Sequence, residues 1–208
     1  VLAAWDRRNN TSSVGAHVWA ELWRRLSGTP TAGSGLPVVT TTLYAVPFDA
    51  ADPVNTPRGL NSASAATVTR TMGELAYTAK FFADNAIPLD RPWGQVQFEV
   101  RNGERVPVHG GSGVSGVYNA ITPAPLVPGV GFAQILAGSS WIQSVTFSHR
   151  GPEARAVLTY SQSSDPANPH YADMTRLFSN YGWVSLPFAE GDIRRDPNLQ
   201  VLRLREKR

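Results

Sequence analysis

A glycine-rich turn is the first candidate for chemistry in this sequence. The stretch VPVHGGSGVSGVYNAI, residues 106–121, contains Gly111-x-Gly113-x-x-Gly116, a literal match to the dinucleotide-binding fingerprint. That site needs a strand before the glycines, a helix whose N-terminus holds the pyrophosphate, and an acidic residue about 20 positions later. Here VYNAI and the proline-rich TPAPLVPGVG follow, and the next acidic residue is Glu153. The sequence therefore favours a tight glycine turn where backbone passes close to backbone.

The same stretch contains a possible oxyanion loop. Residues 109–111 read HGG, which is similar to the loop that binds the oxyanion in esterases. Such a loop acts together with a G-x-S-x-G nucleophile elbow. Ser115 lacks the second glycine of that motif, because Val117 occupies the position. A Ser–His–Asp esterase is therefore not favoured.

The histidines and aspartates do not suggest a metal centre. The four histidines are scattered, without the pattern of a helical metal site, and they are His17, His109, His149 and His170. Three aspartates could be considered as calcium ligands, namely Asp165, Asp173 and Asp192. None of them lies in the spacing of a calcium-binding loop. Surface or hydrogen-bonded structural roles for the histidines, and turn or capping roles for the aspartates, are favoured. We predict no metal and no cofactor.

The six tryptophans could form a platform for sugar binding. Trp19 and Trp23 lie on the apolar stripe of an expected helix, and Trp141 lies in an expected strand. Large aromatic side chains contribute most of their energy when they are buried. The sequence therefore favours core packing for these residues over a sugar site.

Composition excludes several classes of function. The chain has 208 residues, 42% hydrophobic and 17% charged, which suits one globular domain or a large piece of a bigger one. A net charge of +3 does not indicate a nucleic-acid partner, and the basic cluster Arg203, Arg205, Lys207 and Arg208 is typical of a solvated terminus. Cysteine is absent, so disulfides are excluded. No apolar run approaches the ~18 residues that span a bilayer, so no membrane partner is expected.

The first half of the chain is expected to be mainly helical. Residues 1–6 have an apolar helical pattern without a capping residue before them, which suggests a fragment or a cleaved subunit. A second helix is expected from a cap at Ser12 or Ser13 to about Ser27, closed by Gly28. A strand over residues 38–46 and a loop over 49–59 precede a long helix, about residues 62–85, with an apolar stripe that stops before a proline.

The second half alternates with period two and predicts antiparallel strands. Apolar residues alternate over residues 96–100 and 106–108 around Asn102-Gly103, the strongest short hairpin signal. A second hairpin is expected from residues 141–147 and 154–160. Asn168 and Pro169 begin a predicted helix that runs to about residue 180. Two more strands are predicted, over residues 183–188 and 199–204. The predicted fold class is α+β.

Several longer stretches together resemble the penicillin acylase family. They are LAAWDRR and SSVGAHVWAELW near the start, VPVHGGSGVSGVYNAI, GSSWIQSVTF, and LTYSQSSDPANPHYADMTRLFSNYGWVSLPFAEGDI. The closest likeness is to the branch of acyl-homoserine lactone and aculeacin-type lipopeptide acylases. The resemblance covers almost the whole chain and is strongest from Ser139 onward. Met174 departs from the glutamine expected there, and we attach no catalytic meaning to it.

The resemblance implies an N-terminal nucleophile hydrolase with an αββα sandwich. In this family a precursor cleaves itself into an α and a β subunit, and the β subunit begins with serine. The serine hydroxyl attacks the amide carbonyl while its own α-amino group, with a pKa near ~8, acts as the base. A backbone N–H and an asparagine amide stabilise the oxyanion. A secreted or periplasmic bacterial enzyme is implied, acting on an acyl amide such as a penicillin, an N-acyl-homoserine lactone or a lipopeptide.

The resemblance places this chain in the C-terminal portion of the β subunit. Val1 has no hydroxyl, and the serine, its neighbouring histidine and the oxyanion asparagine belong to segments that precede it. Asn9, Asn10 and Asn119 do not lie in the family's asparagine context, so we predict no catalytic residue. Residues 1–208 are expected to be one structural unit, completed by the α subunit and the N-terminal part of the β subunit, which pair with its exposed sheet edges. A stand-alone β-rich binding module and an inactive paralogue remain alternatives.

Overall fold

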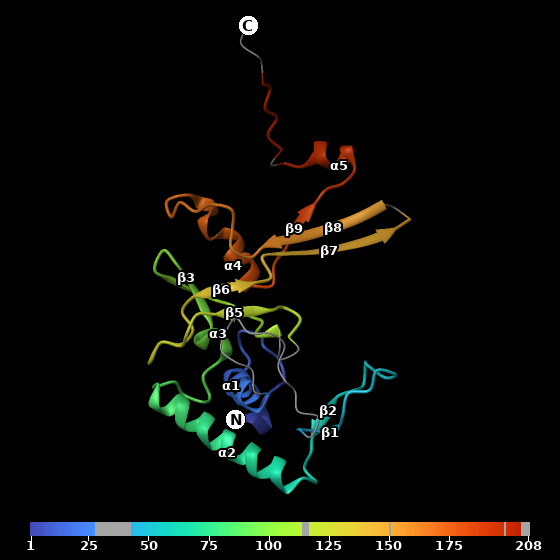
Figure 1. The fold of residues 1–208 in the computed structure, drawn as a ribbon. Coiled ribbons are helices and arrows are strands. Elements are labelled where there is room, and N and C mark those ends of the chain that lie inside the picture. Colours follow the sequence, from blue (N-terminus) through green and yellow to red (C-terminus); the bar gives the residue numbers. More distant parts are fainter. Residues whose placement is uncertain (28–42, 114–116, 150, 198, 205–208) are drawn as a thin grey trace. The chain divides into compact units, whose positions relative to one another are not determined.

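The computed structural model of the chain describes residues 1–27, 43–113, 117–149, 151–197 and 199–204. They form two compact units, Val1–Ser139 and Ser140–Arg208, and each is described by itself. The first unit combines helices with two-stranded hairpins, and the second combines a three-stranded sheet with short helices (Figure 1). All the named strands pair in the antiparallel sense. The predicted α+β class is confirmed.

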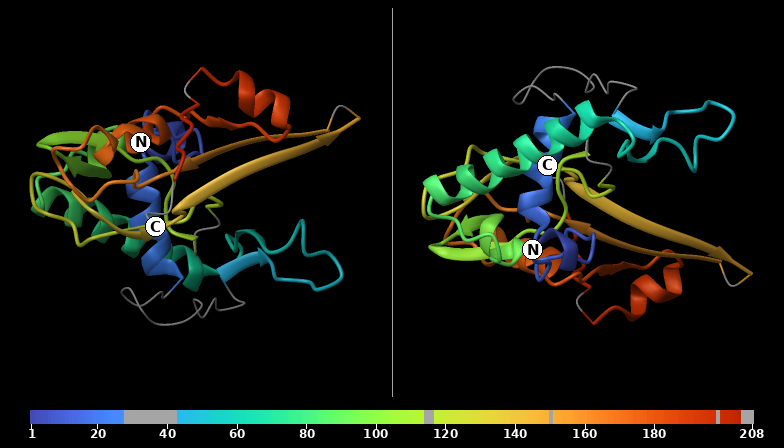
Figure 2. Two further views of the ribbon diagram at one scale, coloured as in Figure 1. Left: turned by 90° about the horizontal axis from the view of Figure 1, so that it is seen from above. Right: turned by 90° about the horizontal axis from the view of Figure 1, so that it is seen from below.

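Two helices that lie side by side form the base of the first unit (Figures 1 and 2). Helix α1, Ala16–Leu26, buries Leu22 and Leu26 on its apolar stripe, as the spacing predicts. Helix α2, Ala65–Asp84, begins where the Ser64 side chain accepts a hydrogen bond from the Thr67 N–H. A buried apolar cluster joins both helices to the segment that follows them, and it consists of Ala16, Phe82, Ile87, Trp93 and Val96.

The beginning of the chain differs from the prediction. The helix expected over residues 1–6 is only a 3₁₀ turn, η1, Leu2–Ala4, because Trp5 is already extended. The cap expected at Ser12 or Ser13 is wrong. Helix α1 starts after Gly15, whose φ of 102° is left-handed, without a side-chain cap. The Ser13 hydroxyl instead donates to the Asp6 carboxylate at 2.9 Å. Gly28, the expected stop, lies outside the described residues.

Three short hairpins complete the first unit. They are β1 with β2 (Tyr44–Val46 and Arg58–Leu60), β3 with β4 (Phe98–Arg101 and Glu104–Pro107), and β5 with β6 (Ile121–Pro123 and Ile135–Gly138). The β3–β4 turn confirms the Asn-Gly signal, because Asn102 and Gly103 have φ angles of 50° and 79°. Only the end of the strand predicted over residues 38–46 is described, as β1. The loop predicted over residues 49–59 runs into β2.

Two parts of the first unit differ from the prediction made from the sequence. Val96 lies in a short helix, α3, Trp93–Val96, and not in a strand. Val108 lies beyond β4, although its N–H donates to the Gln97 carbonyl at 3.1 Å. Strands β5 and β6 were not predicted. They are short and lie in proline- and glycine-rich sequence, so tertiary pairing rather than local propensity forms them.

The second unit is built on the predicted long hairpin. Strand β7, Trp141–Ser148, pairs along its whole length with β8, Gly151–Leu158, and β8 also pairs with β9, Val184–Leu186 (Figure 1). The helix expected after Asn168 begins there, but it is divided into η4, Pro169–Tyr171, and α4, Asp173–Ser179.

The end of the second unit departs from the prediction. Helix α5, Glu190–Arg195, was not predicted. The strand predicted over residues 199–204 is wrong, because these residues pair with no strand in the part of the chain that the structure describes. Leu202 is 85% exposed and Leu204 is 95% exposed. A strand exists only when a partner takes up its hydrogen bonds, so an apolar β-rich sequence alone does not create one. Among the described helices, none is sufficiently long and apolar to cross a bilayer.

Replacing Gly73 by alanine is expected to stabilise the protein by about 0.5–1 kcal/mol, because alanine loses less conformational entropy inside a helix. Gly73 lies within α2, and nothing lies within 4 Å of an added Cβ. Urea denaturation of the full-length protein measures the change. Gly129→Ala is the control, because that position is also open but has a φ of 74°, so it should destabilise. Destabilisation by Gly73→Ala would contradict the expectation.

Candidate functional site

The glycine turn is held in place by its own backbone hydrogen bonds. The Gly110 N–H donates to the Asn9 carbonyl at 2.9 Å, and the Gly111 N–H donates to the Asn119 carbonyl at 3.1 Å. In return, the Gly111 carbonyl accepts from the Ile121 N–H at 2.7 Å. The turn therefore lies between the first residues of the chain and the segment that enters β5.

Three side chains also hold the same turn through hydrogen bonds to its backbone. The Trp93 indole Nε1 donates to the Gly110 carbonyl at 2.8 Å, and the Gln97 amide donates to the Val108 carbonyl at 3.0 Å. The Asn119 amide donates to the His109 carbonyl at 3.1 Å. Trp93 and Gln97 are almost fully buried, so these bonds are formed away from water. The polar groups act on protein backbone, which is a structural role.

This geometry decides which of the possible roles the glycines have. An oxyanion hole needs N–H groups that point at a reacting atom, whereas the N–H groups of Gly110 and Gly111 already donate to carbonyls. A nucleotide site needs a helix at the glycines, whereas the described residues from 117 lead into strand β5. An added Cβ at Gly111 would contact the Asn9 side chain. The structure confirms the predicted close approach of backbone segments.

An apolar cavity of about 530 Å³ lies beside this turn. Its described lining residues are Leu2, Trp5, Arg7, Asn9, Trp19, Ala20, Ser112 and Val117. Ser112 is the one hydroxyl in this set, and the set contains no histidine or carboxylate that could act as its base. The cavity offers apolar contact but no pair for nucleophilic or acid–base chemistry.

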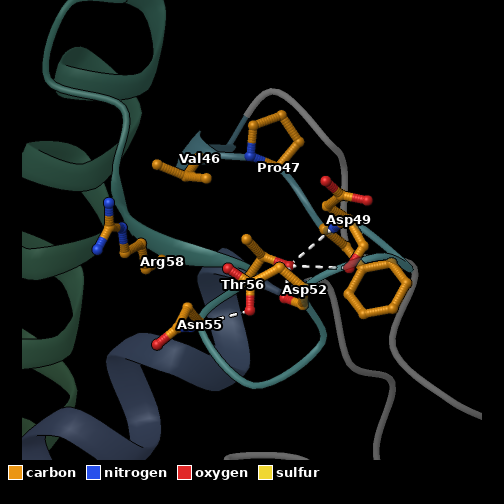
Figure 3. Close-up of a pocket in the computed structure, with 8 residues that line it drawn as sticks. Val46, Pro47, Asp49, Asp52, Asn55, Thr56 and Arg58 are labelled. Carbon is orange, nitrogen blue, oxygen red and sulfur yellow. Dashed lines mark hydrogen bonds between the residues drawn. The ribbon is translucent and has the colours of Figure 1, made fainter.

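A second, more polar cavity of about 580 Å³ lies in the loop between β1 and β2 (Figure 3). Its polar groups are bound to the loop itself. The Thr56 hydroxyl donates to the Asp52 carbonyl at 2.6 Å and accepts from the Asp49 N–H at 2.8 Å. The Asp52 carboxylate accepts from the Asn55 amide at 2.9 Å, while the Arg58 guanidinium points away (Figure 3). These contacts shape the loop and leave no paired catalytic groups.

The histidines occupy separate places in the two units. His17 is 1% exposed, and its Nε2 lies 3.2 Å from the Pro88 carbonyl. His109 contacts the Asn119 amide through Nδ1 at 3.1 Å. His149 is exposed at the end of the β7–β8 hairpin. These positions agree with the structural roles that the sequence favoured.

His170 and Asp173 form a pair that the sequence analysis did not connect. They are three residues apart, and the His170 Nδ1 lies 2.7 Å from the Asp173 carboxylate. Partial burial would raise the pKa of Asp173, but the hydrogen bonds from His170 and the Met174 N–H outweigh it and hold that pKa below its usual value. Both side chains are exposed, and they join η4, which contains His170, to Asp173 at the start of α4, so the pair is a surface interaction at a helix start.

The other aspartates and the tempting asparagines have local roles. Asp165 accepts from the Ala167 N–H at 2.9 Å, as expected for a turn. Asp192 instead forms an ion pair with Arg195 within α5. The described residues contain no group of three side chains that could hold a metal ion. The carbonyls of Asn9 and Asn119 both accept hydrogen bonds from the glycine turn. The Asn10 carbonyl instead accepts from the Ser13 N–H.

The tryptophans are less buried than expected. Trp5, Trp19 and Trp23 stack in a row with ring centroids 5.7 Å apart at each step, packed partly on the core. Trp141 is 51% exposed, so core packing is wrong for it within the described residues. The buried pair that the sequence analysis missed is Trp93 and Gln97, which hydrogen-bond the glycine turn. The available signal was a glutamine between the two apolar residues Val96 and Phe98.

Comparison with known proteins identifies the family. A family model described as penicillin amidase matches residues 1–195. The chain is 34% identical over 206 residues to aculeacin-A acylase of Actinoplanes utahensis, covering 99% of this chain and 24% of that protein. It is also 34% identical over 206 residues to acyl-homoserine lactone acylase PvdQ of Pseudomonas fluorescens strain Pf0-1, covering 99% and 25%. The chain belongs to the penicillin amidase family, as its sequence motifs predicted.

The match concerns part of longer proteins. The chain spans about a quarter of the length of these relatives. A thermostable penicillin G acylase structure from Alcaligenes faecalis is 16% identical, with a TM-score of 0.36, and covers 98% of this chain and 40% of that chain. A score this low does not define a shared arrangement of elements.

Proposed function

We propose that this chain is the C-terminal portion of the β subunit of an acylase that hydrolyses an acyl amide. The family match over residues 1–195, together with relatives named as acylases, carries this proposal. The substrate class is a penicillin, an N-acyl-homoserine lactone or a lipopeptide. A serine at the start of the β subunit attacks the carbonyl, its α-amine passes the proton to the leaving amine, and water then releases the acid.

The chain's own contribution is structural. Neither described cavity pairs a nucleophile with a base. The polar groups around the glycine turn form hydrogen bonds with backbone groups. Its helices and hairpins would complete an αββα sandwich whose remaining strands lie on other segments. The α subunit and the N-terminal part of the β subunit are the proposed partners, and a secreted or periplasmic location belongs to the same proposal.

The test uses the full-length protein expressed with its processing intact. Intact-mass analysis should show a polypeptide that starts with serine. Residues 1–208, identified by peptide mapping after digestion, should belong either to that polypeptide or to a chain in complex with it. Short incubation with a fatty acyl or phenylacetyl amide should then leave the acyl mass on that N-terminal serine. Acyl mass on a peptide within residues 1–208, or no turnover of any acyl amide, would overturn the proposal.

A further inference from the structure

The three-stranded sheet of the second unit has one apolar face. Neighbouring side chains along a strand point to opposite faces, and the pairing register joins the strands row by row. Trp141 lies opposite Leu158, Val145 opposite Ala154, and Phe147 opposite Pro152. Ala154 lies in turn opposite Leu186. The resulting apolar face is defined by Trp141, Val145, Phe147, Ala154, Ala156 and Leu186.

Over the outer half of the hairpin the opposite face of the same sheet is polar, whereas nearer the base Ile142 pairs with Val157 on that face. The register pairs Ser144 with Arg155, and Thr146 with Glu153. Arg155 lies opposite Ser185 on the next strand. A sheet with one apolar and one polar face is typical of strands that pack on one side only. The pattern of side chains on this hairpin therefore indicates that another layer covers the apolar face.

Within the second unit taken by itself, the described residues supply no such layer over most of this face, although Ala156 is buried. Phe147 is 83% exposed, Trp141 is 51% exposed, and Val145 is 41% exposed. The one long polar side chain in the row, Gln143, accepts a hydrogen bond from the Trp141 indole at 3.3 Å, which partly satisfies it within the face. Contiguous exposed apolar side chains of this kind mark an interaction surface.

We propose that an apolar layer of the parent acylase, from sequence outside residues 1–208, covers this face. The inference rests on the proposed function, because that function supplies the parent protein. The relatives are about four times as long as this chain, so most of their residues could supply the layer. The apolar face carries no charged side chain in its register rows, so its partner surface must also be apolar.

Neighbouring residues on β7 provide a matched test. Phe147 and Thr146 are both exposed in this chain, but they lie on opposite faces. The chain has no cysteine, so Phe147→Cys and Thr146→Cys each introduce one thiol into it. In the native full-length protein, maleimide labelling followed by peptide mass analysis should be about 100-fold slower at position 147 than at 146. Labelling in denaturant gives the reference rate for each thiol.

Photo-crosslinking identifies what covers the face. Phe147→p-benzoylphenylalanine in the full-length protein should crosslink to a peptide outside residues 1–208, while the same substitution at Thr146 should not. Equal labelling at both positions, whether fast or slow, would overturn the proposal. So would a crosslink from position 147 to residues 1–139 of the same chain or to residues 1–208 of a second copy.

These readouts do not depend on catalysis. A protein that hydrolyses no acyl amide, yet protects position 147 and crosslinks outside residues 1–208, would refute the proposed function and retain the interaction surface. A protein with full acylase activity and rapid labelling at position 147 would retain the function and refute the surface.

Discussion

The Gly110→Ala variant is expected to lose about 3–5 kcal/mol of folding stability, one of the largest effects of a single methyl group in this chain. Gly110 has a left-handed φ of 94°, which strains any residue with a Cβ. The added Cβ would also lie 2.5 Å from both the side-chain nitrogen and the backbone oxygen of Asn119. The side chain could rotate away, but the backbone oxygen could not. Urea denaturation of the full-length protein, followed by tryptophan fluorescence, measures the loss.

Gly103→Ala is the matched control for this effect. Gly103 also has a positive φ, 79°, but nothing lies within 4 Å of an added Cβ. It should therefore show only the cost of the backbone conformation, about 1 kcal/mol. Similar losses for the two variants would mean that the φ angle, and not the approach of Asn119, requires glycine at position 110.

Acid is expected to weaken the protein through His17. Burial lowers the pKa of the His17 imidazole from 6.5 to about 4, and the charge of Arg91 adds to this. The Pro88 carbonyl, which accepts from Nε2, and the charge of Asp90 act in the opposite direction. The ring lies against the edge of Phe82 with centroids 4.9 Å apart, in the apolar contact of α1 with α2.

The sign follows from the two protonation states. Between pH 6.5 and about 4 the unfolded histidine binds a proton and the folded one does not, so stability is complete above 6.5 and falls as the pH decreases through this window. A shift of this size corresponds to a loss of about 3 kcal/mol. Urea denaturation from pH 7 to pH 4 should show this loss in the natural protein and not in His17→Gln.

The comparison between variants carries the prediction, because it isolates the contribution of His17 from any other effect of acid. His149→Gln is the control, because His149 is exposed, and it should keep the pH dependence of the natural protein. If His17→Gln loses stability with acid as steeply as the natural protein does, another group is responsible.

Strong local signals predicted several elements correctly. Apolar spacing indicated α1 and α2, and Asn102-Gly103 indicated the β3–β4 turn, because both central residues must adopt positive φ. The hairpin predicted from residues 141–147 and 154–160 is present as β7 and β8. Where the signal was generic, the prediction failed. Residues 199–204 have strand-like composition without a partner, and Ser13 binds Asp6 instead of capping α1.

The sequence by itself determined the family, the α+β class and the lack of a helix between residue 117 and β5, because these depend on local order along the chain. Only the tertiary structure decided what the glycines contact. Asn9 and Trp93 lie far from Gly110 in the sequence, and folding alone brings them to it. It also decided which aromatic residues stay exposed. Burial depends on the neighbouring layer, and a residue's type does not specify whether that layer lies within the same segment.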